Sequence, residues 1–195
     1  MSEALHLATI LERLRDETAH QHRSLEAHLP LLDPTLTRPM YAELLRRFWG
    51  YYDPIEEALL TAMQRGSMDF DYASRLKTPL LENDLNALGE PSFARLRCTR
   101  LPTLAMLPQL LGSLYVIEGS TLGGQVITRH LAAHLGLRPE SGCGFFNGYG
   151  PATGPRWRSF RAFLTEAAGS LDQDDLIVAG ANDTFETLEA WLSHG

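Results

Sequence analysis

The chain has 195 residues, a length that suits one domain with a sizeable buried core. Hydrophobic residues make up 44% and charged residues 21%, which is an ordinary globular composition. A net charge of −7 without a basic run argues against nucleic acid or an anionic membrane as a partner. No apolar run is long enough to cross a membrane, and the charged N-terminus is unlike a signal peptide. Two cysteines, Cys98 and Cys143, fit a reduced cytoplasmic protein better than a disulfide scaffold.

The first predicted helix spans residues 5–29, because apolar positions recur there three and four residues apart. The stripe consists of Leu11, Leu14, Thr18, His22, Leu25 and Leu29. A histidine on such a face is more often a hydrogen-bonded core residue than a ligand, so spacing alone does not assign His22 a role. His20 and His28 lie far round the helix and are predicted to be solvated.

Prolines and threonines mark the next two predicted helices. Thr37 is predicted to cap a helix that is broken or kinked at Pro54 and continues to Gln64. Thr78 is predicted to cap a shorter helix that reaches Leu88. The aromatic residues of the earlier helix are interpreted as core, and they are Phe48, Trp49, Tyr51 and Tyr52.

Residues 112–125, GSLYVIEGSTLGGQ, combine apolar helical spacing with several glycines. Each glycine inside a helix costs about 1 kcal/mol relative to alanine, so the glycines require a reason. Gly119 and Gly123 are four residues apart and leave a strip of bare backbone on one face. Either another helix packs against this strip or a flat ligand does. We expect a bent helix that begins between Thr103 and Pro108 and ends near Gly136, a typical residue after a helix C-terminus.

The remaining sequence predicts a loop and two helices. Residues 137–155 are glycine-rich and form the predicted loop. A helix over residues 155–170 follows, and the last helix covers residues 174–192, where apolar residues share one face. No segment alternates convincingly with period two, so the expected fold class is all-α.

Two segments carry a resemblance to a known family. LYVIEGSTLGGQ, within residues 112–125, resembles the distal helix of the heme oxygenases, in the bacterial biliverdin-producing form found beside phytochromes. LRDETAHQHRSLEAH resembles the family's proximal segment, in which a threonine lies four residues before the heme-ligating histidine and a glutamate four after. Thr18, His22 and Glu26 meet that pattern. The resemblance implies one domain over residues 1–195, with His22 as the ligand of the heme iron.

The resemblance also implies roles for the glycine segment. Gly119, Gly123 and Gly124 are expected along the distal face of the heme, which lies between the proximal helix and a kinked distal helix. Other members carry an aspartate directly after the first distal glycine, where it orders a proton-donating water chain. This chain has Ser120 there, whose hydroxyl can hold a water but carries no charge.

Further site residues follow from the same resemblance. Arg15 is expected to meet the heme propionates, with Arg158 and Arg161 as weaker candidates, and Phe185 is expected to pack near the heme. The tyrosine that contacts a propionate in other members aligns with Leu114. Tyr115 lies one residue further along.

The implied activity is O2-dependent opening of heme to biliverdin, CO and iron, with electrons from a separate ferredoxin or flavin reductase. A bacterial phytochrome is the expected acceptor of the biliverdin. A non-enzymatic heme carrier or sensor and a heme-iron acquisition enzyme are the alternatives. A di-iron site is disfavoured because only one Glu-x-x-His pair, Glu17 and His20, occurs. His130 and His134 are spaced to chelate a metal, but a solvated helix face is favoured.

Overall fold

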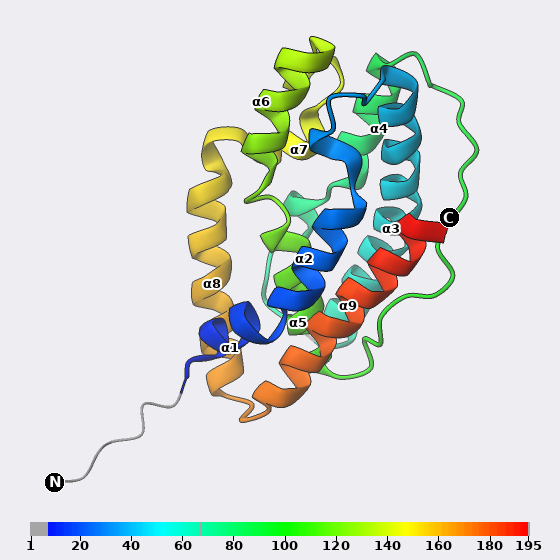
Figure 1. Ribbon diagram of the computed structural model, residues 1–195. Coiled ribbons are helices and arrows are strands. Elements are labelled where there is room, and N and C mark those ends of the chain that lie inside the picture. The colour runs from blue at the N-terminus through cyan, green and yellow to red at the C-terminus, as the bar shows by residue number, and fades with distance from the viewer. Residues whose placement is uncertain (1–7, 67, 195) are drawn as a thin grey trace, which may run out of the picture.

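The computed structural model describes residues 8–66 and 68–194, and all regular secondary structure in these ranges is helical. Figure 1 shows α2 and α9 side by side, with α8 and α6 along one side of the molecule and α3 and α4 along the other. The helices longer than one turn are α1 (Ile10–Glu17), α2 (Ala19–His28), α3 (Arg38–Arg65), α4 (Thr78–Ala87), α5 (Leu107–Gly119), α6 (Gly124–Leu135), α8 (Thr153–Gly169) and α9 (Asp174–His194). The expected all-α class is therefore confirmed.

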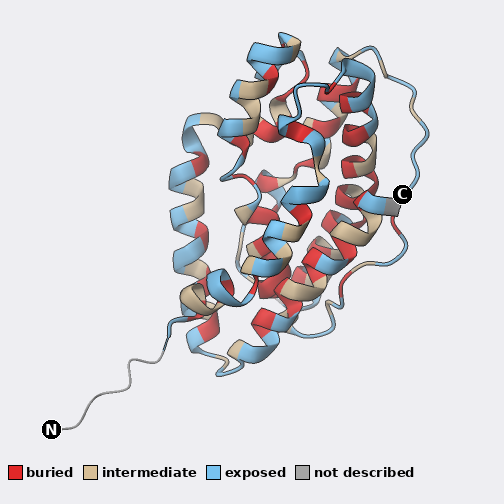
Figure 2. Ribbon diagram, in the orientation of Figure 1, coloured by how far each residue is buried: buried red, intermediate tan, exposed pale blue. Residues whose placement is uncertain are grey.

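The centre of the fold is the pair α5 and α9, whose backbones approach closely. A Cβ atom on Gly112 would lie 2.1 Å from the carbonyl oxygen of Ile177, and one on Gly180 would lie 2.5 Å from that of Gln109. Only glycine permits this approach. Figure 2 shows buried residues on the inward face of α9 and exposed residues on its outer face, whereas no residue of α5 is exposed. Helix packing is therefore the reason for Gly112.

The N-terminal segment forms two helices where one was predicted over residues 5–29. Thr18 has φ −107° and ψ 0°, and its hydroxyl donates to the carbonyl of Leu14 over 2.7 Å, so α1 ends there and α2 begins at the next residue. Residues 5–7 of the predicted helix lie outside the described residues. Leu14 and Thr18 are buried, whereas the His22 side chain is 55% exposed. The predicted buried stripe is wrong at His22.

Of the two outcomes predicted at Pro54, a break or a kink, the break is wrong, because α3 runs through this residue. Proline has no N–H to donate to the carbonyl of Gly50, one turn earlier. That carbonyl accepts instead from the backbone N–H of Cys98, over 2.8 Å. A neighbouring segment thus replaces the missing helical hydrogen bond. Gly50 allows the approach, since a Cβ there would lie 2.5 Å from the carbonyl oxygen of Leu96.

The start of α4 is capped by another helix. Thr78 is the first helical residue and not the cap, which corrects the sequence prediction. The carboxylate of Glu56, on α3, accepts from the backbone N–H groups of Lys77 and Thr78 over 2.6 and 3.0 Å. A buried carboxylate therefore supplies the acceptors that the N-terminus of α4 requires.

The glycine segment is bent by a full break. Residues 120–123 form a turn between α5 and α6, and Gly136 ends α6 in the left-handed conformation, as predicted. The predicted loop 137–155 contains the short helix α7 (Gly144–Asn147). Asp84 holds this helix by accepting from the N–H groups of Gly144 and Phe145 over 2.7 and 2.8 Å.

The last two helices match their predicted ranges closely, and the predicted apolar face of α9 is buried from Ile177 to Leu192. No helix in the described ranges is both long and apolar enough to cross a membrane.

Candidate functional site

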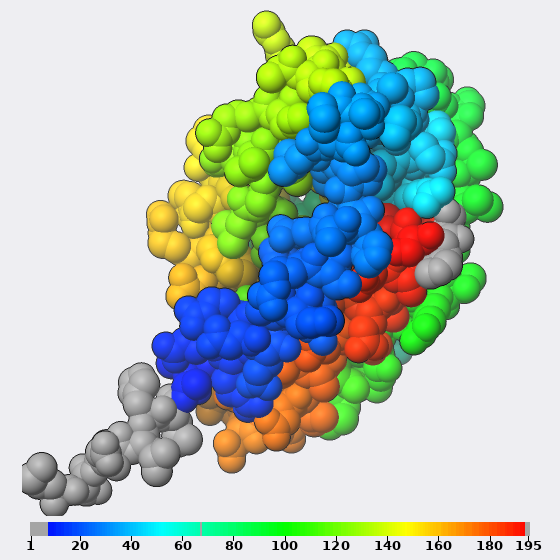
Figure 3. Space-filling view, viewed as in Figure 1, coloured from blue at the N-terminus to red at the C-terminus, as the bar shows by residue number. Residues whose placement is uncertain are grey.

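A cavity of about 440 Å³ lies between α1 and α2 on one side and the junction of α5 and α6 on the other. Its volume falls within the range of ligand pockets. Figure 3 shows a hollow between the blue α2 segment and the yellow-green α6 segment. The lining is mainly apolar and aromatic, and includes Leu25, Leu29, Phe48, Phe145, Phe146, Trp157, Phe185 and Leu188. Such a lining suits a large, flat, mostly apolar ligand.

His22 projects from α2 into this cavity. The edge of its ring faces Phe185, with the ring centroids 5.8 Å apart and the planes at 74°. Its Nε2 atom lies 3.6 Å from the nearer carboxylate oxygen of Glu26, which is too long for a good hydrogen bond. The imidazole is therefore exposed to the cavity and free to bind a ligand. His20 and His28 are exposed, as predicted, and lie outside the lining.

The other residues expected on the proximal side also line the cavity. Thr18, Glu26 and Phe185 are all part of the wall. The hydroxyl of Thr18 is committed to its own helix, so Thr18 shapes the wall and offers no donor to a ligand. The predicted proximal group is thus brought together by the structure.

The three glycines of the α5–α6 junction have two different environments. Gly119 and Gly123 line the cavity; a Cβ on Gly119 would lie 3.6 Å from Trp157, and one on Gly123 would meet nothing within 4 Å. Gly124 lies outside the lining, and a Cβ there would lie 1.8 Å from the carbonyl oxygen of Phe146. The structure thus places Gly124 outside the cavity wall, where it packs α6 against α7, and its contact with heme stays a prediction.

Ser120 lines the cavity, but its hydroxyl already has protein partners. It donates to the carbonyl of Ile117 over 2.8 Å and lies 3.1 Å from the hydroxyl of Tyr52. Burial raises the pKa of Tyr52, so this phenol stays protonated at neutral pH. All four aromatic residues of α3 are buried, which agrees with their interpretation as core. Phe48 and Tyr52 also line the cavity, whereas Trp49 and Tyr51 do not.

The arginines are divided between the cavity and the outer surface. Arg15 lines the cavity, is 70% exposed, and bonds Asp16 through two nitrogens over 2.7 and 3.1 Å. Arg23, which the sequence analysis did not single out, also lines it. Arg158 and Arg161 are exposed on α8 and outside the lining, so the structure does not place them in the cavity wall.

Of the two neighbouring positions considered for the propionate-contacting tyrosine, Leu114 and Tyr115, the second reaches the cavity. It lines the wall, whereas Leu114 is fully buried elsewhere. Burial raises the pKa of Tyr115, and the nearby positive charges of Arg15 and Arg161 oppose the rise. The tyrosine one residue beyond the aligned position is therefore the one of the two that lines the cavity.

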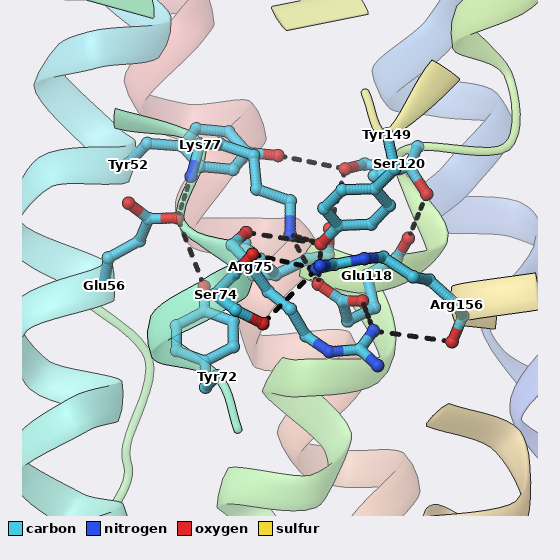
Figure 4. Close-up of polar contacts among 12 residues, drawn as sticks. Tyr52, Glu56, Tyr72, Ser74, Arg75, Lys77, Glu118, Ser120, Tyr149 and Arg156 are labelled. Atoms are coloured by element: carbon cyan, nitrogen blue, oxygen red, sulfur yellow. Dashed lines mark hydrogen bonds and ion pairs between the residues drawn. The ribbon is translucent and has the colours of Figure 1, made fainter. Parts of the chain in front are cut away.

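A buried charged cluster adjoins the cavity, and the sequence analysis did not find it (Figure 4). Arg75 donates to the Glu118 carboxylate over 2.6 Å, and the Lys77 ammonium donates to the same carboxylate. The hydroxyl of Tyr149 accepts from Lys77 and donates to Glu118, each over 2.7 Å. Glu118 directly precedes Gly119, and Lys77 lines the cavity. A glutamate inside the apolar run LYVIEG was the available signal.

The remaining metal and nucleophile candidates lie elsewhere. His130 is half-buried and His134 exposed, so the predicted solvated face holds only for His134. Within the described residues no group of three or more histidine, cysteine or acidic side chains could hold a metal ion. Both cysteines are buried, outside the cavity lining.

Comparison with known proteins decides the family. The heme oxygenase family model matches residues 8–194. The chain belongs to the heme oxygenase family. A heme oxygenase of Xanthomonas campestris pv. campestris is 30% identical over 167 residues, covering 78% of this chain and 88% of that protein.

Solved heme oxygenases share the fold of this family member. The NO- and CO-bound enzyme of Neisseria meningitidis is 20% identical, with a TM-score of 0.77 over 95% of this chain and 91% of that one. The enzyme of Leptospira interrogans is 17% identical, with a TM-score of 0.75 over 96% and 100%. Heme oxygenase-1 of Synechocystis, in complex with heme, is 17% identical, with a TM-score of 0.66 over 95% and 91%. The heme oxygenase-like fold is confirmed.

Proposed function

We propose that this heme oxygenase family member binds heme in the cavity and opens it with O2 to biliverdin, CO and iron. The observation that carries the proposal is the pairing of two walls. An exposed imidazole, His22, stands on α2, and the bare backbone of Gly119 and Gly123 lies at the α5–α6 junction. The heme-bound Synechocystis structure of similar fold supports heme as the ligand.

The residues present fit heme in chemistry as well as size. His22 would ligate the heme iron, and the ring contact with Phe185 would limit rotation of the imidazole. Arg15 and Arg23 would meet the propionates, since both are cations of the lining. When bound, heme supplies the iron that activates O2 and the macrocycle that is opened.

The glycine wall explains why a ligand as small as O2 could enter. A Cβ on Gly123 would meet no atom within 4 Å, so the backbone there borders open space. Any larger side chain would fill that space. This part of the wall would therefore leave room for O2 beside a bound heme.

The electron donor and the acceptor of the product are proposed from the sequence segments that resemble the family. Electrons come from a separate ferredoxin or flavin reductase, as in the family that the glycine segment and the proximal segment resemble. The LYVIEGSTLGGQ form supports supply of biliverdin to a bacterial phytochrome in the cytoplasm.

Hemin titration followed by reduction tests the activity. We expect one equivalent of hemin to give a Soret band, and ascorbate or a ferredoxin system to replace it with the red absorbance of biliverdin. Catalase should not prevent the change, which excludes attack by free peroxide. A Soret band that persists under reductant and O2 would identify a heme carrier instead.

Co-expression with a bacterial phytochrome apoprotein tests the acceptor. We expect a red-absorbing holoprotein, with weak or undetectable binding between the purified pair, because product can pass through solution. A colourless photoreceptor, despite heme turnover by the purified enzyme, would refute the phytochrome assignment alone.

A further inference from the structure

The charged side chains of the cavity wall are unevenly placed. Among the described residues of the lining, Arg15, Arg23 and Glu26 all belong to α1 and α2, the wall that carries His22. Lys77, which precedes α4, is the one charged side chain from any other element. Among the described lining residues, Lys77 is therefore the only Lys, Arg, Asp or Glu outside the wall that carries His22.

Lys77 is held in an unusual environment for a lysine. Its side chain is 1% exposed, and its ammonium donates to Glu118 and to the hydroxyl of Tyr149. The rings of Tyr149 and Tyr72 lie within 5.1 and 5.7 Å of the Nζ atom. Figure 4 shows the Lys77 side chain running toward Glu118 and Tyr149. The ammonium is fixed in position.

The cluster connects the cavity wall to the outside of the protein. Tyr149 is half-buried, and the guanidinium of Arg156 lies 4.6 Å from the centre of its ring. Arg156 is likewise half-buried and donates to the carbonyl of Ser74 over 2.8 Å. A hydrogen bond therefore joins Lys77, in the wall, to the hydroxyl of a half-buried tyrosine.

Stability of the fold does not by itself require charged side chains at this buried place. Apolar residues of similar volume would serve as well or better in a buried position, because burying ions costs more than pairing them returns. Lys77 is also the only lysine among 17 basic residues. A lysine can give up a proton near neutral pH when it is buried, whereas an arginine cannot. Of the 17 lysine and arginine side chains, the position thus holds the one that is able to release a proton.

The groups around Lys77 set its acidity. Burial and the positive charge of Arg75 lower the pKa of Lys77, and the carboxylates of Glu118 and Glu56 oppose the shift. The result is an ammonium that is a stronger acid than an ordinary lysine.

We propose that Lys77 delivers protons to the cavity and regains them through the hydroxyl of Tyr149, with Glu118 as a fixed counter-ion. This inference rests on the proposed function, because the opening of heme consumes protons and Ser120 offers no ionisable group.

The transfer moves protons and no electrons. An N–H bond of the Lys77 ammonium breaks, and its proton passes to an acceptor in the cavity, leaving a neutral amine. The Tyr149 hydroxyl turns from Glu118 to Nζ and passes its proton to the amine in the same step as a water molecule donates a proton to the phenolic oxygen. No phenolate forms, because burial and Glu118 raise the pKa of this phenol. The hydroxide left behind passes to bulk solvent and balances the proton delivered to the cavity.

A direct test uses the single lysine. In protein labelled with ¹⁵N-lysine, one side-chain ammonium signal is expected, from Lys77. Loading with zinc protoporphyrin, a diamagnetic heme analogue, should move this signal, because the ring current of the macrocycle would reach a group in the wall. A signal that stays in place while the analogue binds would overturn the proposal.

Matched tyrosine variants test the relay. Tyr149→Phe removes one hydroxyl of the cluster, and the control Tyr51→Phe removes a buried hydroxyl that bonds Thr184 and Thr187 outside the lining. Both should bind hemin like the parent. Turnover should fall about 10²-fold in Tyr149→Phe, the range of general acid–base effects, with a larger solvent isotope effect. The control should match the parent.

Lys77→Arg completes the set, because it keeps the charge but cannot release a proton. It should bind hemin and turn over as slowly as Tyr149→Phe. If both variants degrade hemin at the parent rate, the relay is refuted and the proposed function stands. If the parent itself binds hemin without degrading it, the proposed function fails, and the relay fails with it.

Discussion

The two walls of the cavity are built in opposite ways. On the α1–α2 wall the His22 and Glu26 side chains are 55% and 63% exposed, and Arg15 is 70% exposed. On the facing side Lys77 and Glu118 are each 1% exposed and bound to one another. Apolar area left open on the first wall would be covered by a ligand, which stabilises the complex. The charged side chains of the second wall are already bonded to one another. Under the proposed function, the first wall therefore binds the ligand and the second supplies fixed groups.

The largest effect on heme binding and turnover is expected from a substitution of His22 on the exposed wall. His22→Ala removes the proposed iron ligand, so the ferric Soret band should shift and turnover should be lost. Hemin affinity should fall by about 10-fold or more, equivalent to about 1.4 kcal/mol. Thermal unfolding should barely change, because the side chain is exposed. His20→Ala is the control, and a His22→Ala spectrum like the parent's would disprove the assignment.

Glu118 should show the largest effect on stability. Glu118→Gln leaves the buried cations Lys77 and Arg75 without their counter-ion, and loss of one partner from a buried ion pair costs about 3–5 kcal/mol. The matched change on the exposed wall, Glu26→Gln, should alter the free energy of unfolding by about 0.5 kcal/mol or less. Urea denaturation measures both. Equal stability of the two variants would show that the cluster is not a structural support of its wall.

Asp84 predicts how stability depends on pH. Burial raises its pKa to about 6, although two backbone N–H groups oppose the rise. Between about pH 4 and 6 the folded protein retains a proton that the unfolded chain releases, so stability falls as pH rises, by about 3 kcal/mol at most. Asp84→Asn cannot titrate. Its stability relative to the parent should therefore improve across this window and stay level above it.

The control for that series is Asp69→Asn, which changes an exposed aspartate. Its stability difference from the parent should not vary with pH in the same window. Parallel pH curves for the parent and Asp84→Asn would contradict the assignment of the pH dependence to Asp84.

The smallest expected effect is a difference in folding stability between alanine variants of two adjacent glycines. Gly124→Ala places a methyl group against the carbonyl of Phe146 and should cost about 1–3 kcal/mol, as overpacking does. Gly123→Ala enters open space and should stay within about 0.5 kcal/mol of the parent. Calorimetry of the two variants measures their stabilities relative to the parent. If both are equally destabilised, the two glycines do not differ in the way the structure shows.

Local patterns were sufficient for much of the fold and for part of the site. The apolar spacing of α9 and the glycine that ends α6 are short-range features, whereas the single bent helix expected in the glycine segment is two helices separated by a turn. The proximal motif places Thr18, His22 and Glu26 along one segment, so their shared wall followed from helical geometry. The roles of these residues toward heme stay predictions.

Other features could not be read from neighbours along the chain. Pro54 remains helical because Cys98 donates to the carbonyl that proline leaves unpaired, a contact across 48 positions of sequence. Three similar glycines divide into two that face the cavity and one that packs against Phe146. No spacing rule distinguishes them, since the difference depends on where α7 lies.

By itself the sequence determined the all-α class, most of the helix positions and the segment that bears the candidate ligand, because amphipathic periodicity and capping act within a few residues. Only the tertiary structure decided which side chains meet in the cavity. It brought Lys77, Glu118 and Tyr149 together from distant parts of the chain, and it left Arg158 outside. The physical reason is that burial of an ion depends on all the elements packed around it. The energy of such a cluster exists only after those elements have assembled.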